Sequence, residues 1–306
     1  MLLTLTARSL EPLLARTASD RRRIESGYDQ DGNVEGGARS PIAIEDIPRF
    51  AMERIGLRGL VVDTSLLRGW PLDRLDRLRM QADQSGCPCL ILRESAPVVI
   101  SAGPGVAADE SDKTFARIET VAKAAHRLGC NAFSLRPYEI TSDIQFDAAA
   151  DLLRKVMDRI DRMELNLLIE PGGGTLANPQ VLIELVKKVG GFRIGTMPSF
   201  AYAARTEDSE TTLRQTAPFS SAIVASCSGL EASGDGHAAE TATRVDLAGS
   251  VQAIKSVGYE QILALDYYPI LQSKATGKKK AASPPPDPIP ILDAARQTIE
   301  QALEKD

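Results

Sequence analysis

The chain alternates short apolar runs with longer segments in which apolar residues recur every three or four positions. The short runs have the length and the leucine, valine and isoleucine content of buried strands. They occupy residues 2–6, 59–63, 89–93, 131–136, 165–170, 192–197, 221–226 and 261–266. The longer segments predict helices, at residues 44–56, 71–85, 113–129, 151–163, 178–189, 246–257 and 290–304. Within 151–163, for example, Leu152, Val156 and Ile160 fall on one helical face.

Strands that alternate with helices predict a parallel sheet covered on both faces. Eight such units in 306 residues favour a closed (β/α)8 barrel, or TIM barrel, which needs about 250 residues around one core. An open doubly wound sheet is the alternative. However, no Gly-x-Gly-x-x-Gly turn follows the first strand, and residues 172–174 lack the spacing of a phosphate-binding loop. We therefore predict an α/β protein with a single barrel over residues 1–306.

Two segments interrupt the alternation. Residues 19–42 are polar and rich in glycine, which predicts a surface insertion between the first strand and the first helix. Residues 273–289 contain three consecutive lysines and then a proline run, which predicts a stiff, solvated Lys/Pro-rich loop before the C-terminal helix. In a barrel, a connection that follows a strand emerges on the face that carries the active site. The second segment would therefore border that site.

Composition narrows the class of protein. Hydrophobic residues make up 43% and charged residues 25% of the chain, and no apolar run approaches the roughly 20 residues of a membrane helix. The net charge of −5 argues against a nucleic-acid partner. Four cysteines, with only Cys87 and Cys89 close together, provide no disulfide framework, and the first residues lack a secretory leader. We expect a reduced, cytoplasmic protein, and the oligomeric state stays open.

Two of the predicted strands end on a carboxylate. Glu170 closes the fifth run just before the glycines at 172–174, and Asp266 closes the eighth run. Because the C-terminal ends of barrel strands surround the active site, both are candidate catalytic residues. Together they could remove a proton next to a sugar carbonyl and return it, provided that a cation stabilises the enediolate oxygen. The competing interpretation of Glu170 is an acid that serves only in a salt bridge.

Several short motifs between residues 43 and 268 resemble the xylose isomerase-like TIM barrel superfamily, in particular its sugar phosphate isomerase/epimerase group. The motifs cover residues 50–60, 128–132, 168–173, 194–200 and 257–267. The resemblance implies a barrel that acts on a small carbohydrate. It also implies a divalent Mn²⁺, Mg²⁺ or Zn²⁺ ion, held by acidic and histidine side chains after strands five to eight.

The metal site that this resemblance implies is degenerate in the sequence. Glu170 matches the glutamate expected after the fifth strand, and Asp266 stands in place of the glutamate after the eighth. Ser199 replaces the aspartate after the sixth strand, and Ser226 and its neighbours supply no histidine after the seventh. Glu170 and Asp266 are left as the candidate metal ligands.

Six further residues are candidates for contact with a substrate: Arg136, Tyr138, Gly173, Tyr202, Tyr267 and His237. Arg136 after the fourth strand, or Arg93 after the third, could stabilise negative charge on the substrate, and the glycine could offer a backbone N–H to a phosphate. The tyrosines follow predicted strands and could form an aromatic rim for a sugar ring or simply pack the loops. The histidine could donate a proton or a metal ligand, or have neither role.

These observations support two hypotheses of different class. The first is an isomerase or epimerase that transfers a proton on a small sugar or sugar phosphate, with or without the help of a divalent metal. The second is a catalytically inactive barrel that binds carbohydrate or a protein partner, for which the absent ligands at positions 199 and 226 are the evidence.

Overall fold

The computed structural model describes residues 1–14, 41–100, 108–227, 245–268 and 287–305. All but the last two residues of the 19–42 segment, all but the last three of the 273–289 segment, and His237 lie outside these ranges.

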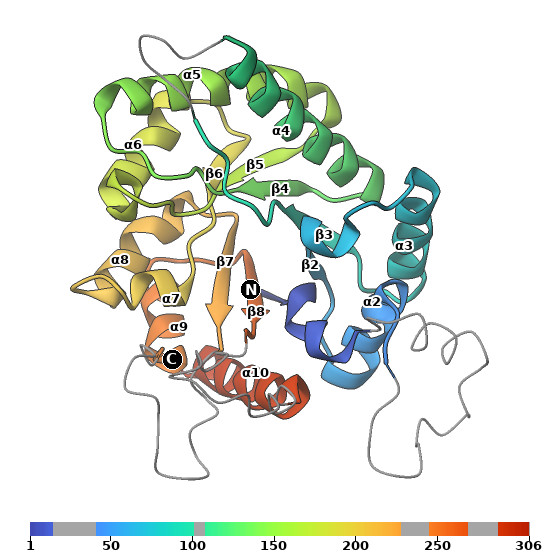
Figure 1. Ribbon diagram of the computed structural model, residues 1–306. Coiled ribbons are helices and arrows are strands. Elements are labelled where there is room, and N and C mark those ends of the chain that lie inside the picture. The colour runs from blue at the N-terminus through green and yellow to red at the C-terminus, as the bar shows by residue number, and fades with distance from the viewer. Residues whose placement is uncertain (15–40, 101–107, 228–244, 269–286, 306) are drawn as a thin grey trace, which may run out of the picture.

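Eight strands lie at the positions that the apolar runs predict (Figure 1). They are β1 (Leu2–Thr6), β2 (Leu60–Asp63), β3 (Cys89–Arg93), β4 (Ala132–Leu135), β5 (Asn166–Ile169), β6 (Ile194–Thr196), β7 (Ala222–Ser226) and β8 (Ile262–Asp266). They form one parallel sheet in the order β6-β5-β4-β3-β2-β1-β8-β7. Parallel bridges from Thr196 to Ser220 and from Ser199 to Val224 join the two end strands. The predicted (β/α)8 barrel is confirmed.

Helices cover the outside of the barrel (Figure 1). They are α2 (Ile47–Phe50), α3 (Leu72–Gln84), α4 (Ala108–Leu128), α5 (Asp143–Ile160), α6 (Pro179–Val189), α7 (Phe200–Ala203), α8 (Ser209–Thr216), α9 (Leu247–Lys255) and α10 (Pro288–Glu304). The predicted 151–163 helix begins earlier, because the Ser142 side chain accepts a hydrogen bond from the Gln145 N–H and so caps α5. Helices α7 and α8, between β6 and β7, were not predicted.

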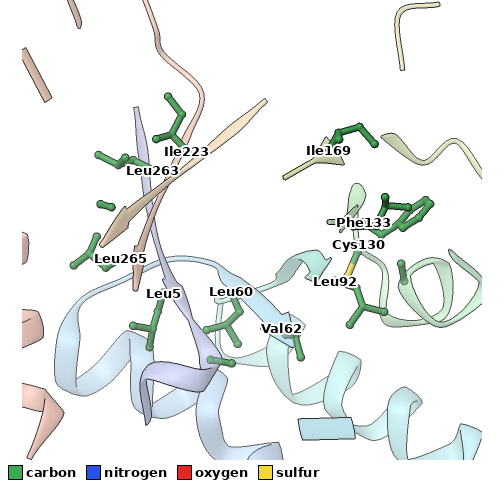
Figure 2. Close-up of a cluster of buried hydrophobic side chains, with 14 of the residues drawn as sticks. Leu5, Leu60, Val62, Leu92, Cys130, Phe133, Ile169, Ile223, Leu263 and Leu265 are labelled. Atoms are coloured by element: carbon green, nitrogen blue, oxygen red, sulfur yellow. The ribbon is translucent and has the colours of Figure 1, made fainter. Parts of the chain in front are cut away.

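Alternate residues of each strand face opposite sides of the barrel wall. Leu60 and Val62 of β2 face outward, into the apolar layer between strands and helices that Figure 2 shows in part. Val61 faces inward and packs in a second cluster with residues such as Leu168 and Ala264. This inner cluster fills the barrel beneath the strand ends, so polar residues at those ends rest on an apolar floor.

Two expectations from composition can be compared with the structure. All four cysteines are buried free thiols. Burial raises the pKa of Cys87 and Cys89 to about 12, so these thiols stay protonated and are not poised to bind a metal. No helix in the described ranges is both long and apolar enough to cross a membrane.

Candidate functional site

A polar cavity of about 170 Å³ lies at the C-terminal ends of the strands. Its charged lining residues are Arg8, Asp63, Arg93, Glu94, Arg136, Glu170, Arg205 and Asp266. The rest of the lining is Ser95, Pro171, Met197, Ser199, Ala201, Tyr202, Val224 and Ser226. With four acids and four arginines around so small a space, the way in which these charges pair determines what the cavity can bind.

Strand register places the polar residues at one level of the barrel. Asp63 ends β2 beside Arg93, which ends β3, and Arg93 lies beside Ser134 of β4. On the other side, Ser226 of β7 lies beside Asp266 of β8. Each of these residues follows, by two positions, an inward-facing apolar residue of the same strand. All of them therefore point into the barrel.

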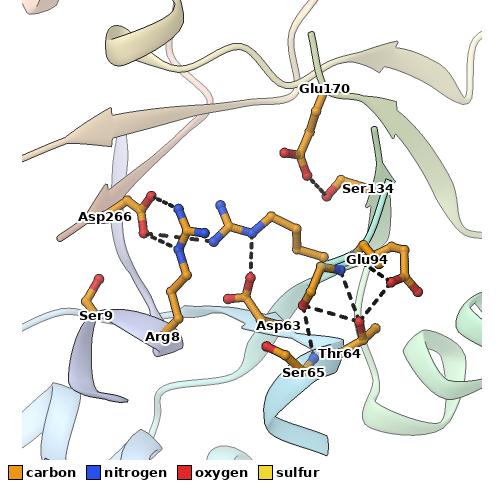
Figure 3. Close-up of polar contacts among 12 residues, drawn as sticks. Arg8, Ser9, Asp63, Thr64, Ser65, Glu94, Ser134, Glu170 and Asp266 are labelled. Carbon is orange, nitrogen blue, oxygen red and sulfur yellow. Dashed lines mark hydrogen bonds and ion pairs between the residues drawn. The ribbon is translucent and has the colours of Figure 1, made fainter. Parts of the chain in front are cut away.

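Asp266 is held by an arginine that follows the first strand. The Arg8 Nε and Nη2 atoms donate to the two carboxylate oxygens of Asp266 over 2.9 and 2.5 Å (Figure 3). Burial by itself would raise the pKa of Asp266, but the charges of Arg93 and Arg8 outweigh burial and hold that pKa below its ordinary value. Asp266 is therefore a fixed anion, poorly suited to accept a proton.

Arg93 is a buried cation in the same cavity, with only 5% of its surface exposed. Its Nε donates to Asp63 Oδ1 over 2.7 Å. Burial would lower the pKa of Arg93, but Asp266, Asp63 and Glu170 reverse that effect and raise it, so the guanidinium stays charged. Arg93 Nη2 and Asp63 Oδ2 find no hydrogen-bond partner in the described part of the chain. Buried polar atoms without a hydrogen bond are rare in folded proteins, so we expect a ligand or a water molecule to satisfy them.

Glu170 differs from the other strand-end acids because it forms no ion pair with any described residue. The Ser134 hydroxyl donates to Glu170 Oε1 over 2.7 Å (Figure 3). Burial raises the pKa of Glu170, and the charges of Arg93 and Arg136 reverse only part of that rise. A carboxyl group with a raised pKa at a cavity wall has the properties of a general acid or base.

Two of the six predicted substrate-contact residues line the cavity, namely Arg136 and Tyr202. The Tyr202 hydroxyl donates to the Ala177 carbonyl oxygen over 3.0 Å, and burial raises the Tyr202 pKa to about 12. Tyr202 thus forms a wall of the cavity, and its hydroxyl stays protonated at neutral pH and is engaged with a backbone carbonyl. Gly173 and the exposed Tyr138 lie outside the lining.

Tyr267 does not lie at the rim of the barrel, where the sequence pattern predicted it, because its side chain is buried. Its side chain is 0% exposed and belongs to the outer apolar layer. The reason is strand alternation: Asp266 faces inward, so the next residue faces the helices. The neighbouring Tyr268 is half exposed, and the Arg8 guanidinium carbon lies 5.5 Å from its ring centre.

Four charged residues of the cavity were not among the candidates: Arg8, Asp63, Glu94 and Arg205. Asp63 carries the same signal as Glu170 and Asp266, because it too ends an apolar run at an inward position. A search for every strand-end acid would have found it. No comparable signal marks the two arginines, which follow β1 and α7.

The two acids that the resemblance nominates as metal ligands do not fit a divalent ion. Both oxygens of Asp266 accept hydrogen bonds from Arg8, and Arg93 Nη2 lies 3.9 Å from Asp266 Oδ1. A metal ion bound by Asp266 and Glu170 would have to displace one guanidinium and lie beside another, which Coulomb repulsion disfavours. The described residues contain no group of three His, Cys, Asp or Glu side chains able to hold a metal.

The two serines at the remaining ligand positions have structural partners. Ser199 Oγ accepts a hydrogen bond from the Tyr202 N–H over 3.0 Å and so caps α7. Ser226 Oγ accepts from the Ala201 N–H over 3.3 Å. Their oxygens satisfy the first backbone N–H groups of a short helix, which have no partner within the helix itself.

A larger hollow, of about 1020 Å³, lies outside the barrel between α3 and α4. Residues such as Leu67, Leu75 and Val121 line it, and it contains neither Glu170 nor Asp266. It offers no cluster of strand-end acids, so the smaller polar cavity is the candidate active site.

No protein-family model matches the sequence, and no curated protein matches it. Similar solved structures include a D-psicose 3-epimerase with D-tagatose from Clostridium cellulolyticum H10, with a TM-score of 0.70 and 14% identity over 100% of both chains. An L-ribulose 3-epimerase has a TM-score of 0.67 and 12% identity over 99% of this chain and 95% of that one. The IOLI protein with a binding zinc atom has a TM-score of 0.59 and 12% identity over 99% and 96%. This chain therefore has the xylose isomerase-like TIM barrel fold that sugar epimerases and isomerases share.

Proposed function

We propose that this protein is an isomerase that transfers a proton between adjacent carbons of a small sugar or sugar phosphate, with Glu170 as the general base. The observation that carries the proposal is the position of Glu170. It lies at the end of β5 on the wall of a polar cavity, without an ion-pair partner among the described residues and with a raised pKa. Its neighbours in the cavity are guanidinium groups, which can stabilise the negative oxygen that proton removal creates.

The proton transfer has two balanced steps. The Glu170 carboxylate takes a proton from the carbon next to the carbonyl, and the C–H electron pair forms a C=C bond while the carbonyl oxygen becomes an enediolate oxygen. Arg93 Nη2, which makes no hydrogen bond to a described residue, donates to that oxygen, and Arg136 adds positive charge. The protonated Glu170 then returns the proton to the former carbonyl carbon, and the C=C electron pair forms that C–H bond. The hydroxyl proton on the other carbon passes to the enediolate oxygen, and the new carbonyl forms at the carbon that first lost its proton.

Isomerisation fits the cavity better than epimerisation at one carbon. Epimerisation needs a second acid or base on the opposite face of the substrate. Asp266 is the obvious candidate, but its oxygens are bound to Arg8 and its pKa is lowered, so it neither accepts nor donates a proton readily at neutral pH. A single base that removes and returns the proton on one face accounts for the arrangement, and Asp266 then serves to hold Arg8 in position.

The charge balance of the cavity favours a substrate with an anionic group. Asp63 and Asp266 are paired with Arg93 and Arg8, and Glu94 is paired with Arg117 over 2.9 Å. Two further arginines line the cavity and make no ion pair with described residues: Arg136 and Arg205. Arginine binds phosphate and carboxylate groups through its fixed fork of N–H donors. We therefore favour a sugar phosphate over a neutral sugar.

An inactive carbohydrate-binding barrel is the second candidate. The ion pairs of Asp63 and Asp266 favour it, because acids fixed in this way can position a ligand without reacting with it. The two candidates differ in one measurable property, which is whether a bound sugar exchanges its carbon-bound hydrogen.

Proton exchange measured by NMR in D₂O separates these candidates. The protein is incubated with a panel of aldose and ketose phosphates and the corresponding free sugars, and deuterium incorporation next to the carbonyl is followed together with product formation. We expect exchange with at least one phosphate, and Glu170→Gln should reduce it by about 100-fold or more, the range that general-base catalysis contributes. Glu184→Gln, at an exposed position of α6, is the matched control and should exchange normally. Binding without any exchange would refute catalysis and support the second candidate.

A further inference from the structure

The Arg93 guanidinium lies among carboxylates from three sides of the barrel. Asp63 comes from β2, Glu170 follows β5 and Asp266 ends β8. These are the three acids whose charges act most strongly on Arg93. Arg93 itself ends β3, so its side chain reaches inward across the mouth of the barrel to a position between acids that the sequence separates widely.

That position coincides with the place where the resemblance to this superfamily calls for a divalent ion, between the acid after the fifth strand and the acid of the eighth. A buried carboxylate needs a nearby positive charge, and a metal ion and a guanidinium can both supply it. In this chain Nε is bound to Asp63 and Nη2 lies 3.9 Å from Asp266. Asp63 and Asp266 thus already have a positive charge beside them, which is supplied by the Arg93 guanidinium.

We propose that Arg93 is the resident cation of this barrel, that its guanidinium takes the place of the divalent ion, and that it excludes such an ion from the cavity. Two independent observations support this. Arg93 is almost fully buried, lines the cavity, and its Nη2 donor makes no hydrogen bond to a described residue. The two serines at the remaining ligand positions are occupied with backbone N–H groups of α7.

A guanidinium differs from a metal ion in what it can do to a substrate. It stays protonated at neutral pH, and it offers directed N–H donors instead of open coordination positions. Arg93 Nη2 is therefore the group that would donate to an enediolate oxygen. This second part of the inference rests on the proposed proton transfer, whereas the exclusion of metal does not.

Metal binding can be measured without any assay of activity. Purified full-length protein is titrated with Mn²⁺, and the bound ion is followed by electron paramagnetic resonance and by thermal shift. We expect no stoichiometric site in the wild type. Arg93→Met should gain one, because it leaves Asp63, Glu170 and Asp266 without their shared cation. The gain should disappear in Arg93→Met/Glu170→Gln and be absent from Arg58→Met, which removes an exposed arginine.

Three results would overturn the inference. One is a stoichiometric Mn²⁺ or Zn²⁺ site in the wild type that Glu170→Gln abolishes. Another is a folded Arg93→Met protein that binds no Mn²⁺. If Arg93→Met does not fold, Arg93→Lys replaces it in the test: lysine keeps the positive charge, so Mn²⁺ binding by that variant is the third contrary result. Failure of the isomerase proposal changes none of these metal measurements, so the two failures are distinguishable.

Discussion

Arg8 and Asp266 form a two-point ion pair between the segment that follows the first strand and the end of the last strand. The pair joins residues 258 positions apart in sequence, at the point where β1 and β8 run side by side. Asp266 is 5% exposed, so this contact neutralises a nearly buried charge at the barrel mouth. It also removes Asp266 from the set of free acids, which leaves Glu170 as the acid available for proton transfer.

Replacement of Arg8 with methionine tests how much this pair stabilises the barrel. We expect the free energy of unfolding to fall by about 2 kcal/mol at pH 7, because a buried carboxylate loses charged hydrogen bonds but keeps Arg93 nearby. The loss is moderated because Arg8 has 34% of its side chain exposed. Urea denaturation measures it. Arg77→Met, which breaks an exposed pair with Asp73, is the control and should cost less than about 1 kcal/mol. Equal losses in the two variants would contradict the prediction.

The Arg93–Asp63 pair is more deeply buried, with side chains 6% and 2% exposed. Arg93→Met alone should destabilise the protein by about 3 to 5 kcal/mol, because it leaves a buried carboxylate without its partner. Arg93→Met/Asp63→Asn should be less destabilised than the sum of the single variants. A double-mutant cycle with chemical denaturation should give a coupling of at least about 1.5 kcal/mol. Additive losses would mean that the two side chains do not stabilise each other.

The raised pKa of Glu170 predicts that ionisation of this carboxyl group lowers the stability of the fold. In the folded protein this carboxyl binds its proton more tightly than in the unfolded chain, so stability is lost as pH rises from the unfolded pKa through the folded pKa. Glu170→Gln removes that ionisation and should raise the melting temperature at pH 7. The difference should disappear below about pH 4, where the acid is protonated in both states. A variant that melts lower than the wild type at pH 7 would contradict this sign.

A gain in stability together with a loss of proton exchange would identify Glu170 as a functional residue. Active sites often keep groups that destabilise the fold, because the reaction needs a perturbed pKa. If Glu170→Gln instead melted lower at pH 7 and left exchange unchanged, the carboxylate would have a structural role only, as in the salt-bridge interpretation.

The positions of the strands could be predicted from the sequence because buried strands leave contiguous apolar runs, as in the segments that became β5 and β8. The 44–56 helix was less regular than predicted: it consists of a 3-10 turn, the short α2 and a π-helical turn. Helices α7 and α8 were missed because four and eight residues are too few to show a helical period.

The candidate site was predictable only in part. Strand alternation alone indicates that Asp63, Glu170 and Asp266 face inward and that Tyr267 faces outward. Which arginine reaches which acid could not be deduced, because the pairing of Arg8 with Asp266 depends on barrel closure. For the same reason, the resemblance could nominate Glu170 and Asp266 as metal ligands without revealing that guanidinium groups already lie beside one of them.

Gly174 is the most tightly packed glycine of the loop that follows Glu170. Gly174 has a φ of +64°, and a Cβ atom there would lie 2.1 Å from the Ile140 carbonyl oxygen. Gly174→Ala should therefore lower the free energy of unfolding by about 3 kcal/mol, from backbone strain and the clash together. At Gly173 a Cβ atom would meet nothing closer than 3.5 Å, so Gly173→Ala should cost less than about 1 kcal/mol. Chemical denaturation of the two variants makes the comparison.

The same pair of variants tests how the glycine loop supports the site. A bridge between Ile140 and Gly174 ties the loop after β5 to the segment after β4, which also carries Arg136. If this tie positions Glu170 relative to Arg136, Gly174→Ala should also reduce proton exchange under conditions where the protein remains folded, because productive geometry tolerates little displacement. Gly173→Ala should retain exchange, since its backbone conformation is open to alanine. Equal exchange in both folded variants would mean that β5 alone, without the glycine loop, fixes the position of the base.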